Sequence, residues 1–305
     1  MIGIKEIASY IPKKRNSNSD LKDKFDMDDL FITDKIGIKS VSVKNLDQDT
    51  SDLCVEAFRN LEKKVSIEKS KIECLFVVTQ NPDYNIPHTS AIVHGKLDMP
   101  ENCACFDISL GCSGYVYGLS VIKSFMIQNE MKQGLLFTAD PYSKVINKED
   151  KNTSILFGDG ASVSFIGNNP KLEIGSFTFG TIGKEFENLI CKDNILAMNG
   201  RAIFNFAAKK IPKDIPELLQ RNNLSKDDID LFIFHQGSKY IVDTITKRLK
   251  LDKSKVPFKV EEYGNTISSS IPILLESEID NPKLKKIVVS GFGVGLSWSS
   301  SVLFK

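Results

Sequence analysis

The chain has 305 residues, of which 41% are hydrophobic, and its 40 basic and 39 acidic side chains leave a net charge of +1. This is the composition of an ordinary globular protein with a sizeable core, built as one large domain or two. The near-neutral charge argues against a broad surface for nucleic acid or membranes. No segment has the apolar length of a membrane span, and the N-terminus lacks a signal-peptide core, so we expect a cytoplasmic protein.

Six cysteines and three histidines raise the question of a disulfide framework or a metal site. A long chain without a secretion signal is expected to keep its cysteines reduced. Cys103 and Cys105 do not have the spacing of a usual zinc site, and the histidines are not grouped around them. We therefore expect neither a disulfide nor a bound metal. The six are Cys54, Cys74, Cys103, Cys105, Cys112 and Cys191.

Helical patterns alternate with short apolar runs along the chain. Residues 51–64 have a helical pattern, and residues 72–80 form a compact apolar run typical of a buried strand. Residues 223–236 repeat the order of helix, acidic turn and buried strand. The alternation predicts an α/β layered architecture in which helices cover mainly buried sheets.

Two repeated patterns within the sequence predict an internal duplication. One is the repeated order of helix and strand. The other relates residues 158–166 to residues 295–304, because in both segments a glycine turn leads into a final strand. We therefore expect two similar halves, residues 1–168 and residues 169–305, that pack together.

Cys112 lies between a short β-prone run and a long apolar-periodic segment, which places it at a predicted strand-to-helix turn. Unpaired backbone N–H groups at a helix start favour thiolate over thiol. The small neighbours Gly111, Ser113 and Gly114 let another backbone or a bulky thioester come close. Free cysteines are also among the most buried residue types, so Cys112 taken alone is more often a core residue than a nucleophile.

Three other segments carry candidate site residues. His235 follows an apolar run and is expected at the carboxyl end of a strand, where α/β folds collect active-site groups. Asn265 precedes a run of small hydroxylated residues that suits a helix start. Residues 291–296 form a glycine loop that either presents N–H groups to a ligand or makes a tight turn. Taken singly, His235 is more often a structural histidine and Asn265 a turn residue.

Seven segments together resemble the β-ketoacyl-acyl carrier protein synthase III family, the initiating condensing enzymes of the thiolase-fold superfamily. The resemblance covers nearly the whole chain, and seven matches in the family's order and spacing are highly specific. In chain order they are Thr50–Leu53, Asn81–Tyr84, Phe106–Gly114, Leu156–Ala161, His235–Gln236, Gly264–Thr266 and Gly293–Trp298.

The resemblance implies a thiolase-like α/β fold, in which two similar halves with mixed sheets pack in an α-β-α-β-α layered arrangement. It places the family's catalytic cysteine, histidine and asparagine on Cys112, His235 and Asn265. It places the two backbone N–H groups of an oxyanion hole on Cys112 and Gly295.

The resemblance also implies the reaction. Cys112 would take the acyl group of a primer thioester such as acyl-CoA, and a malonyl-acyl carrier protein would lose carbon dioxide to give an enolate that attacks it. Neutral His235 and the Asn265 amide would donate to the enolate oxygen. The product is a 3-oxoacyl-acyl carrier protein, in fatty-acid or related acyl-chain biosynthesis. A homodimer is implied, with no cofactor besides the substrates.

Phe31, Lys35 and Lys151 fall on positions that bind coenzyme A in the family. The family usually has a tryptophan and an arginine at the first two of these. Phenylalanine offers a smaller stacking face, and lysine a point charge without the bidentate fork. We therefore expect altered or weaker coenzyme A binding, and Lys35 also reads as an ordinary solvated lysine.

Lys247 and Arg248 match part of the basic patch that docks the acidic carrier, while Asn205 and Tyr240 replace two other basic positions. Ile86 falls where the family closes the partner subunit's acyl pocket, and its side chain is expected to admit a longer or branched primer. The region from residue 180 to residue 197 is shorter than usual for the family, and the sequence assigns it no lining role.

Two other functions stay open at this point. An acyltransferase of the same fold would pass the acyl group from Cys112 to an oxygen or nitrogen acceptor without decarboxylation, but only the condensing branch needs the Asn265 donor. A non-catalytic subunit would use the fold for partner binding, and the intact Cys112, His235 and Asn265 argue against it.

Overall fold

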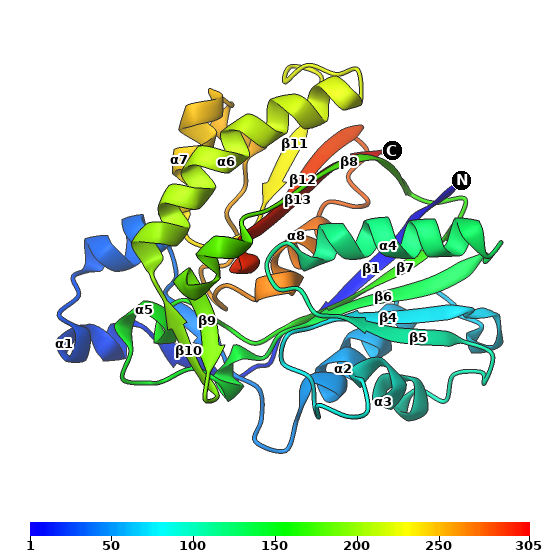
Figure 1. Cartoon of the computed structure of the whole chain (residues 1–305), viewed down its shortest axis with the longest axis horizontal. Helices are drawn as coiled ribbons and strands as arrows, with labels where there is room; N and C mark the ends of the chain where they lie inside the picture. The colour runs from blue at the N-terminus through cyan, green and yellow to red at the C-terminus, as the bar shows by residue number, and fades with distance from the viewer.

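The computed structural model describes all 305 residues, and nine strands form one continuous mixed sheet in the order β11-β12-β13-β8-β1-β7-β6-β4-β5 (Figure 1). Five strands come from the N-terminal half and four from the C-terminal half. The first set is β1 (Ile2–Tyr10), β4 (Cys74–Val78), β5 (Ala104–Ile108), β6 (Gln133–Ala139) and β7 (Ala161–Asn168). The second set is β8 (Leu172–Thr181), β11 (Leu231–Phe234), β12 (Lys286–Gly293) and β13 (Ser297–Phe304).

The two halves are joined where β1 pairs with β8 through only two residue pairs, Gly3 with Glu173 and Ile4 with Leu172. A side chain at Gly3 would place its Cβ 2.4 Å from the Leu172 carbonyl oxygen. Glycine is therefore required at this position for the two strands to approach. The predicted boundary between residues 168 and 169 falls in the short connection from β7 to β8.

Helices form three layers around the two parts of the sheet (Figure 1). The middle layer, α4 and α8, packs against strands of both halves, whereas α2 and α3 cover the outer face of the N-terminal strands and α6 and α7 that of the C-terminal strands. The predicted α-β-α-β-α order is confirmed. The helices are α2 (Thr50–Glu62), α3 (Thr89–Lys96), α4 (Gly114–Gln128), α6 (Gly200–Arg221), α7 (Lys239–Leu249) and α8 (Ser270–Glu276).

The helix α4 occupies the middle layer because its sequence is apolar around most of its circumference, a pattern typical of a buried helix. Its largest buried side chain, Tyr115, keeps its hydroxyl satisfied by a 3.0 Å hydrogen bond to Ser164 Oγ. The predicted helix at residues 51–64 is α2, which starts with a capping box made by Asp49 and Asp52. The apolar run at residues 72–80 is β4.

Several short elements complete the chain, and no helix combines the length and apolar character needed to cross a membrane. The hairpin β9–β10 lies within the region that the sequence left without a role. These elements are β2 (Arg15–Ser17), α1 (Lys22–Phe25), η2 (Phe31–Ile36), β3 (Ser40–Ser42), η4 (Tyr142–Lys144), α5 (Lys151–Ser154), η5 (Gly183–Asn188), β9 (Leu189–Lys192), β10 (Ile195–Met198) and η7 (Ile267–Ser269).

The packing of helices in the middle and outer layers predicts different effects for two glycine-to-alanine substitutions. At Gly114 in α4 the new Cβ would stand 2.4 Å from Val78 Cγ1, so Gly114→Ala should destabilise the fold by about 1–3 kcal/mol through overpacking. At Gly95 in α3 no atom lies within 4 Å, so Gly95→Ala should be neutral or stabilise by up to about 1 kcal/mol. Urea denaturation of both variants checks this. Equal effects at the two positions would contradict the packing described for α4.

Candidate active site

Cys112 lies in the turn between β5 and α4, as predicted, and its side chain is only 4% exposed. The strand β12 passes directly against this turn. A Cβ on Gly293 would stand 2.8 Å from Cys112 Sγ, and a Cβ on Gly291 would stand 2.6 Å from the Cys112 carbonyl oxygen. Glycine at these two positions therefore lets the backbone of the C-terminal half reach the thiol.

Two opposing effects set the pKa of the Cys112 thiol, namely burial and hydrogen bonding from backbone donors. Burial raises the pKa of the thiol to about 12, while hydrogen bonding from the backbone of Val294 and of Cys112 itself lowers it, and the Asp140 carboxylate raises it further. The thiolate-stabilising N–H groups expected at a helix start are present, but burial outweighs them. The resting group is therefore a neutral thiol at physiological pH.

The second backbone donor at the thiol is that of Val294, whereas the sequence assigned this position to Gly295. Gly295 lines a neighbouring cavity and not the one that holds Cys112. The oxyanion hole assigned to Cys112 and Gly295 stays a prediction, and the backbone group found at the thiol itself is that of Val294.

His235 follows β11 directly and is buried beside Phe292, whose ring meets it edge-on at 5.7 Å between centroids. Burial lowers the pKa of His235 to about 3, so the imidazole is neutral at physiological pH. Its Nδ1 lies 2.8 Å from Ser270 Oγ. When the Ser270 hydroxyl donates to Nδ1, the proton of the neutral ring sits on Nε2, which leaves Nε2–H as a donor.

Asn265 is held by its own backbone and by its side-chain oxygen. Its N–H donates to the Leu156 carbonyl at 2.8 Å, and its carbonyl accepts from Gly158 N at 2.9 Å. Its Oδ1 accepts a 2.9 Å hydrogen bond from Ile267 N, which fixes the amide so that Nδ2 is the free end. Nδ2 lies 3.4 Å from His235 Nε2. In the tautomer that carries its proton on Nε2, His235 therefore presents a second N–H donor beside that of Asn265.

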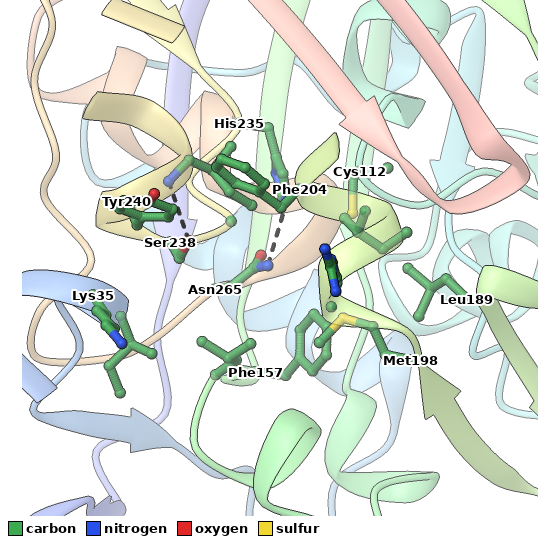
Figure 2. A pocket seen from close by; sticks show the side chains of 18 of the residues that line it. Lys35, Cys112, Phe157, Leu189, Met198, Phe204, His235, Ser238, Tyr240 and Asn265 are labelled. Atoms are coloured by element: carbon green, nitrogen blue, oxygen red, sulfur yellow. Dashed lines mark hydrogen bonds between the residues drawn. The ribbon is translucent and has the colours of Figure 1, made fainter. Parts of the chain in front are cut away.

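Cys112, His235 and Asn265 line one cavity of about 570 Å³ with mainly hydrophobic walls. In Figure 2 the thiol lies between Leu189 on one side and the His235 and Asn265 side chains on the other. The structure thus brings together the three residues that the sequence singled out, from three separate loops. A buried thiol facing two neutral N–H donors is arranged for acyl transfer with stabilisation of a developing oxyanion.

Two of the three residues expected to bind coenzyme A line this cavity. Phe31 and Lys35 line it, and Lys35 lies toward the end opposite Leu189 in Figure 2. Lys151 does not line the cavity. Its Nζ lies 4.7 Å from the Phe31 ring centroid and donates to the Phe25 carbonyl at 2.7 Å, so Lys151 supports the aromatic wall from behind.

Three other predicted residues lie outside the cavity. Ile86 is 89% exposed on the surface. Lys247 and Arg248 occupy the last turn of α7, and Arg248 Nη1 donates to the Ala208 carbonyl at 2.8 Å, which ties α7 to α6. The structure thus gives Arg248 a packing role, and Lys247 beside it in the same turn has no such contact to α6.

Sequence reasoning missed two groups of site residues. Ser270, which orients His235, was seen only as part of a hydroxyl-rich run, and that run was the signal available. The lining of the cavity also contains Arg201 and Phe204, whose ring stacks 5.0 Å from that of Tyr240. Leu189, from the shortened region, forms part of the wall near Cys112.

The buried imidazole predicts that His235 does not titrate in the physiological range. Its folded pKa is lowered to about 3 from an unfolded value near 6.5, so the fold loses stability as pH falls below about 6.5. NMR titration of the three histidine rings checks this, with His235→Ala assigning the resonance. The His235 signal should stay at its neutral position from pH 8 to about pH 5. A midpoint near pH 6.5 would contradict the burial argument.

The sequence is similar to known proteins along nearly its whole length. Residues 106–183 match the family model described as 3-oxoacyl-[acyl-carrier-protein (ACP)] synthase III, and residues 219–304 match the model of its C-terminal part. The β-ketoacyl-[acyl-carrier-protein] synthase III of Caldanaerobacter subterraneus subsp. tengcongensis is 35% identical, over 99% of this chain and 97% of the relative. That of Streptococcus mutans is 32% identical, over 98% of each chain.

Solved structures give the same result. A crystal structure of a 3-oxoacyl-(acyl-carrier-protein) synthase III superimposes with a TM-score of 0.94 at 31% identity, over 100% of this chain and 99% of the other. The Thermus thermophilus enzyme superimposes with a TM-score of 0.92 at 29% identity, over 99% of both chains. Together with the matches above, these similarities show that the chain belongs to the β-ketoacyl-[acyl-carrier-protein] synthase III family.

Proposed function

We propose that this protein catalyses the decarboxylating condensation of an acyl primer with a malonyl-acyl carrier protein, giving a 3-oxoacyl-acyl carrier protein for fatty-acid or related acyl-chain synthesis. One observation carries this proposal: the Cys112 thiol faces the His235 and Asn265 N–H donors inside one largely apolar cavity. Acyl transfer alone needs the thiol and an oxyanion hole. The paired donors supply what an enolate needs in addition.

In the first half-reaction, the Cys112 sulfur attacks the carbonyl carbon of the primer thioester. The carbonyl oxygen gains negative charge and is stabilised by the N–H groups of Cys112 and Val294. The bond to the departing sulfur then breaks, and that sulfur leaves as a thiol with the proton that Cys112 loses. The product is an acyl-Cys112 thioester. Because the resting thiol is neutral, proton removal must accompany the attack.

In the second half-reaction, the malonyl thioester loses carbon dioxide and the electron pair of the broken bond forms an enolate. Its oxygen accepts from His235 Nε2–H and Asn265 Nδ2–H, which lie 3.4 Å apart. The enolate carbon attacks the acyl-Cys112 carbonyl and releases the cysteine sulfur, which takes up a proton from solvent. All electron pairs come from the substrates, so we propose that the reaction uses no cofactor.

The mouth of the cavity supports a primer carried by coenzyme A. Phe31 offers a stacking face, and Lys35 Nζ, 5.7 Å from that ring, offers a charge for phosphate. We also propose that the acidic carrier docks near Lys247 on α7. The protein is proposed to act as a homodimer in which the exposed Ile86 meets the partner subunit.

An acyltransferase that spares the carboxyl group is the second candidate. Such an enzyme would need Cys112 but would have no use for a fixed amide donor beside His235. The hydrogen bond from Ile267 N to Asn265 Oδ1 holds Nδ2 toward the imidazole, and this favours condensation. If the protein acylated an alcohol or amine acceptor and released no carbon dioxide, acyl transfer would become the favoured function over condensation.

Intact-mass measurement after incubation with a panel of acyl-CoA and acyl-carrier thioesters tests the proposed nucleophile. The wild-type protein should gain one acyl group, and Cys112→Ser should form the adduct and the 3-oxoacyl product at least about a hundredfold more slowly. Cys191→Ser is the matched control, since that thiol is exposed outside the Cys112 cavity. A Cys112→Ser protein with wild-type condensation would overturn the mechanism.

The paired donors predict that the two half-reactions separate in Asn265→Ala. Condensation should fall about 10²–10³-fold, as is typical for the loss of one oxyanion donor, while acylation of Cys112 is largely spared. Acylation is followed by intact mass and condensation by release of labelled carbon dioxide. Asn45→Ala, at an exposed asparagine, is the control for both assays. Equal loss of both half-reactions in Asn265→Ala would refute the role given to the amide.

A further inference from the structure

Ser113 follows Cys112 directly and is the N-cap residue of α4, but its side chain makes no capping hydrogen bond to that helix. Serine is preferred at N-caps because its hydroxyl accepts from a backbone N–H of the first turn. The Ser113 hydroxyl lies instead 2.8 Å from Ser297 Oγ, in the other half of the molecule. Both residues are buried, so a tertiary hydrogen bond takes the place of the local one.

Ser297 is the first residue of β13 and pairs with Gly293 of β12 across the loop of residues 294–296. Its hydroxyl donates to the Val294 carbonyl at 2.8 Å. Because a serine hydroxyl has a single proton, Ser297 must accept from Ser113, and this fixes the direction of both hydrogen bonds. The two hydroxyls therefore form a chain that runs from Ser113 through Ser297 to the Val294 carbonyl.

This chain ends on the loop that meets the nucleophile. Hydrogen bonding from the Val294 backbone reaches the Cys112 thiol, and a Cβ on Gly111 would stand 2.8 Å from Val294 Cγ1. Val294 has a glycine on either side, so the local backbone has wide conformational freedom. Such a loop keeps one direction only where neighbouring groups hold it, and the Ser297 hydroxyl is one of these groups.

The hydrogen bond to the Val294 carbonyl also orients the next N–H group. The peptide unit between Val294 and Gly295 is planar, so a carbonyl held toward Ser297 holds the Gly295 N–H on the opposite side. A carbonyl that accepts a hydrogen bond also polarises its peptide unit and strengthens the N–H as a donor. Both backbone groups considered for the oxyanion hole beside that of Cys112 therefore depend on Ser297.

We propose that Ser297, supported by Ser113, is a positioning residue for acyl transfer, whose hydroxyl holds the loop of Val294 and Gly295 in place to donate to the acyl carbonyl oxygen. This proposal rests on the proposed function and extends its machinery to two residues outside the substrate cavity. Both half-reactions place negative charge on that oxygen. Loss of the Ser297 hydroxyl should therefore slow both, whereas loss of the Asn265 amide slows condensation.

Ser297→Ala and Ser299→Ala form a matched pair for the test. Ser299 lies on the same strand, is fully buried, and its hydroxyl makes no hydrogen bond. Cys112 acylation is followed by rapid quenching and intact mass, with the thioester of the panel above that loads the wild type fastest. Ser297→Ala should lower the maximal rate at least about tenfold and keep the half-saturating concentration within about twofold. Ser299→Ala should keep both wild-type values.

The hydroxyl itself is tested by a conservative variant. Ser297→Thr keeps a hydroxyl on the same carbon and should acylate Cys112 within about threefold of the wild-type rate. Condensation, measured by release of labelled carbon dioxide, should follow the same order among the variants. A threonine variant as slow as the alanine variant would overturn the role given to the hydroxyl.

The infrared spectrum of the acyl-enzyme gives a readout that a loss of stability alone would not move. Hydrogen bonds from N–H donors lower the stretching frequency of the acyl-Cys112 carbonyl, which a ¹³C label in the primer carbonyl isolates from the protein bands. Folded Ser297→Ala should show this band at a higher frequency than the wild type, and Ser299→Ala should leave it in place. An unchanged band in Ser297→Ala would mean that the loop keeps its position without the hydroxyl, and the proposal would be wrong.

The outcomes separate this proposal from the proposed function. If no thioester acylates wild-type Cys112, the proposed function fails and this proposal fails with it. If the wild type is acylated and Ser297→Ala matches Ser299→Ala in rate and carbonyl band, only this proposal is overturned. Should Ser297→Ala fail to fold, Ser113→Ala replaces it, since it removes only the contact between the two hydroxyls. That variant should lower the rate and raise the frequency by smaller steps, and unchanged values again overturn the proposal.

Discussion

The close approach of the β12 backbone to the turn that carries Cys112 is the constraint on which the rest of the site depends. Gly291 and Gly293 leave no room for a side chain against Cys112, so the two halves of the molecule meet there backbone to backbone. This contact brings the backbone of Val294 to the thiol and places β11, paired in parallel with β12, so that His235 faces the same cavity. The donors of one half therefore serve the nucleophile of the other.

Burial determines the protonation state of the two titratable site residues. It keeps Cys112 as a thiol and His235 as a neutral imidazole, and the Asn265 amide beside them is a donor that carries no charge. Neutral N–H donors stabilise negative charge when it develops on a substrate oxygen, and no ion pair within the site competes for them beforehand. The same low-polarity surroundings strengthen each hydrogen bond to that oxygen.

The sequence was sufficient for the parts of the fold and site that depend on local pattern. The strand-to-helix turn at Cys112, the strand end at His235 and the layered α/β order all followed from apolar periodicity and small residues. The backbone of Val294 at the thiol was not singled out, because the path of this loop depends on backbone angles at two glycines that no local rule specifies. The Ser270 contact to His235 and the Ser113 contact to Ser297 depend on tertiary packing between distant segments.

The order in which the site's parts occur along the chain has a consequence for biosynthesis. Cys112 is translated early, whereas the glycines that press against it and the Val294 amide belong to the strand and turn made almost last. A nascent chain therefore carries Cys112 without its cavity until translation is nearly complete. The thiol is enclosed beside the Val294 backbone and the donors of the other half only when the C-terminal strands join the sheet.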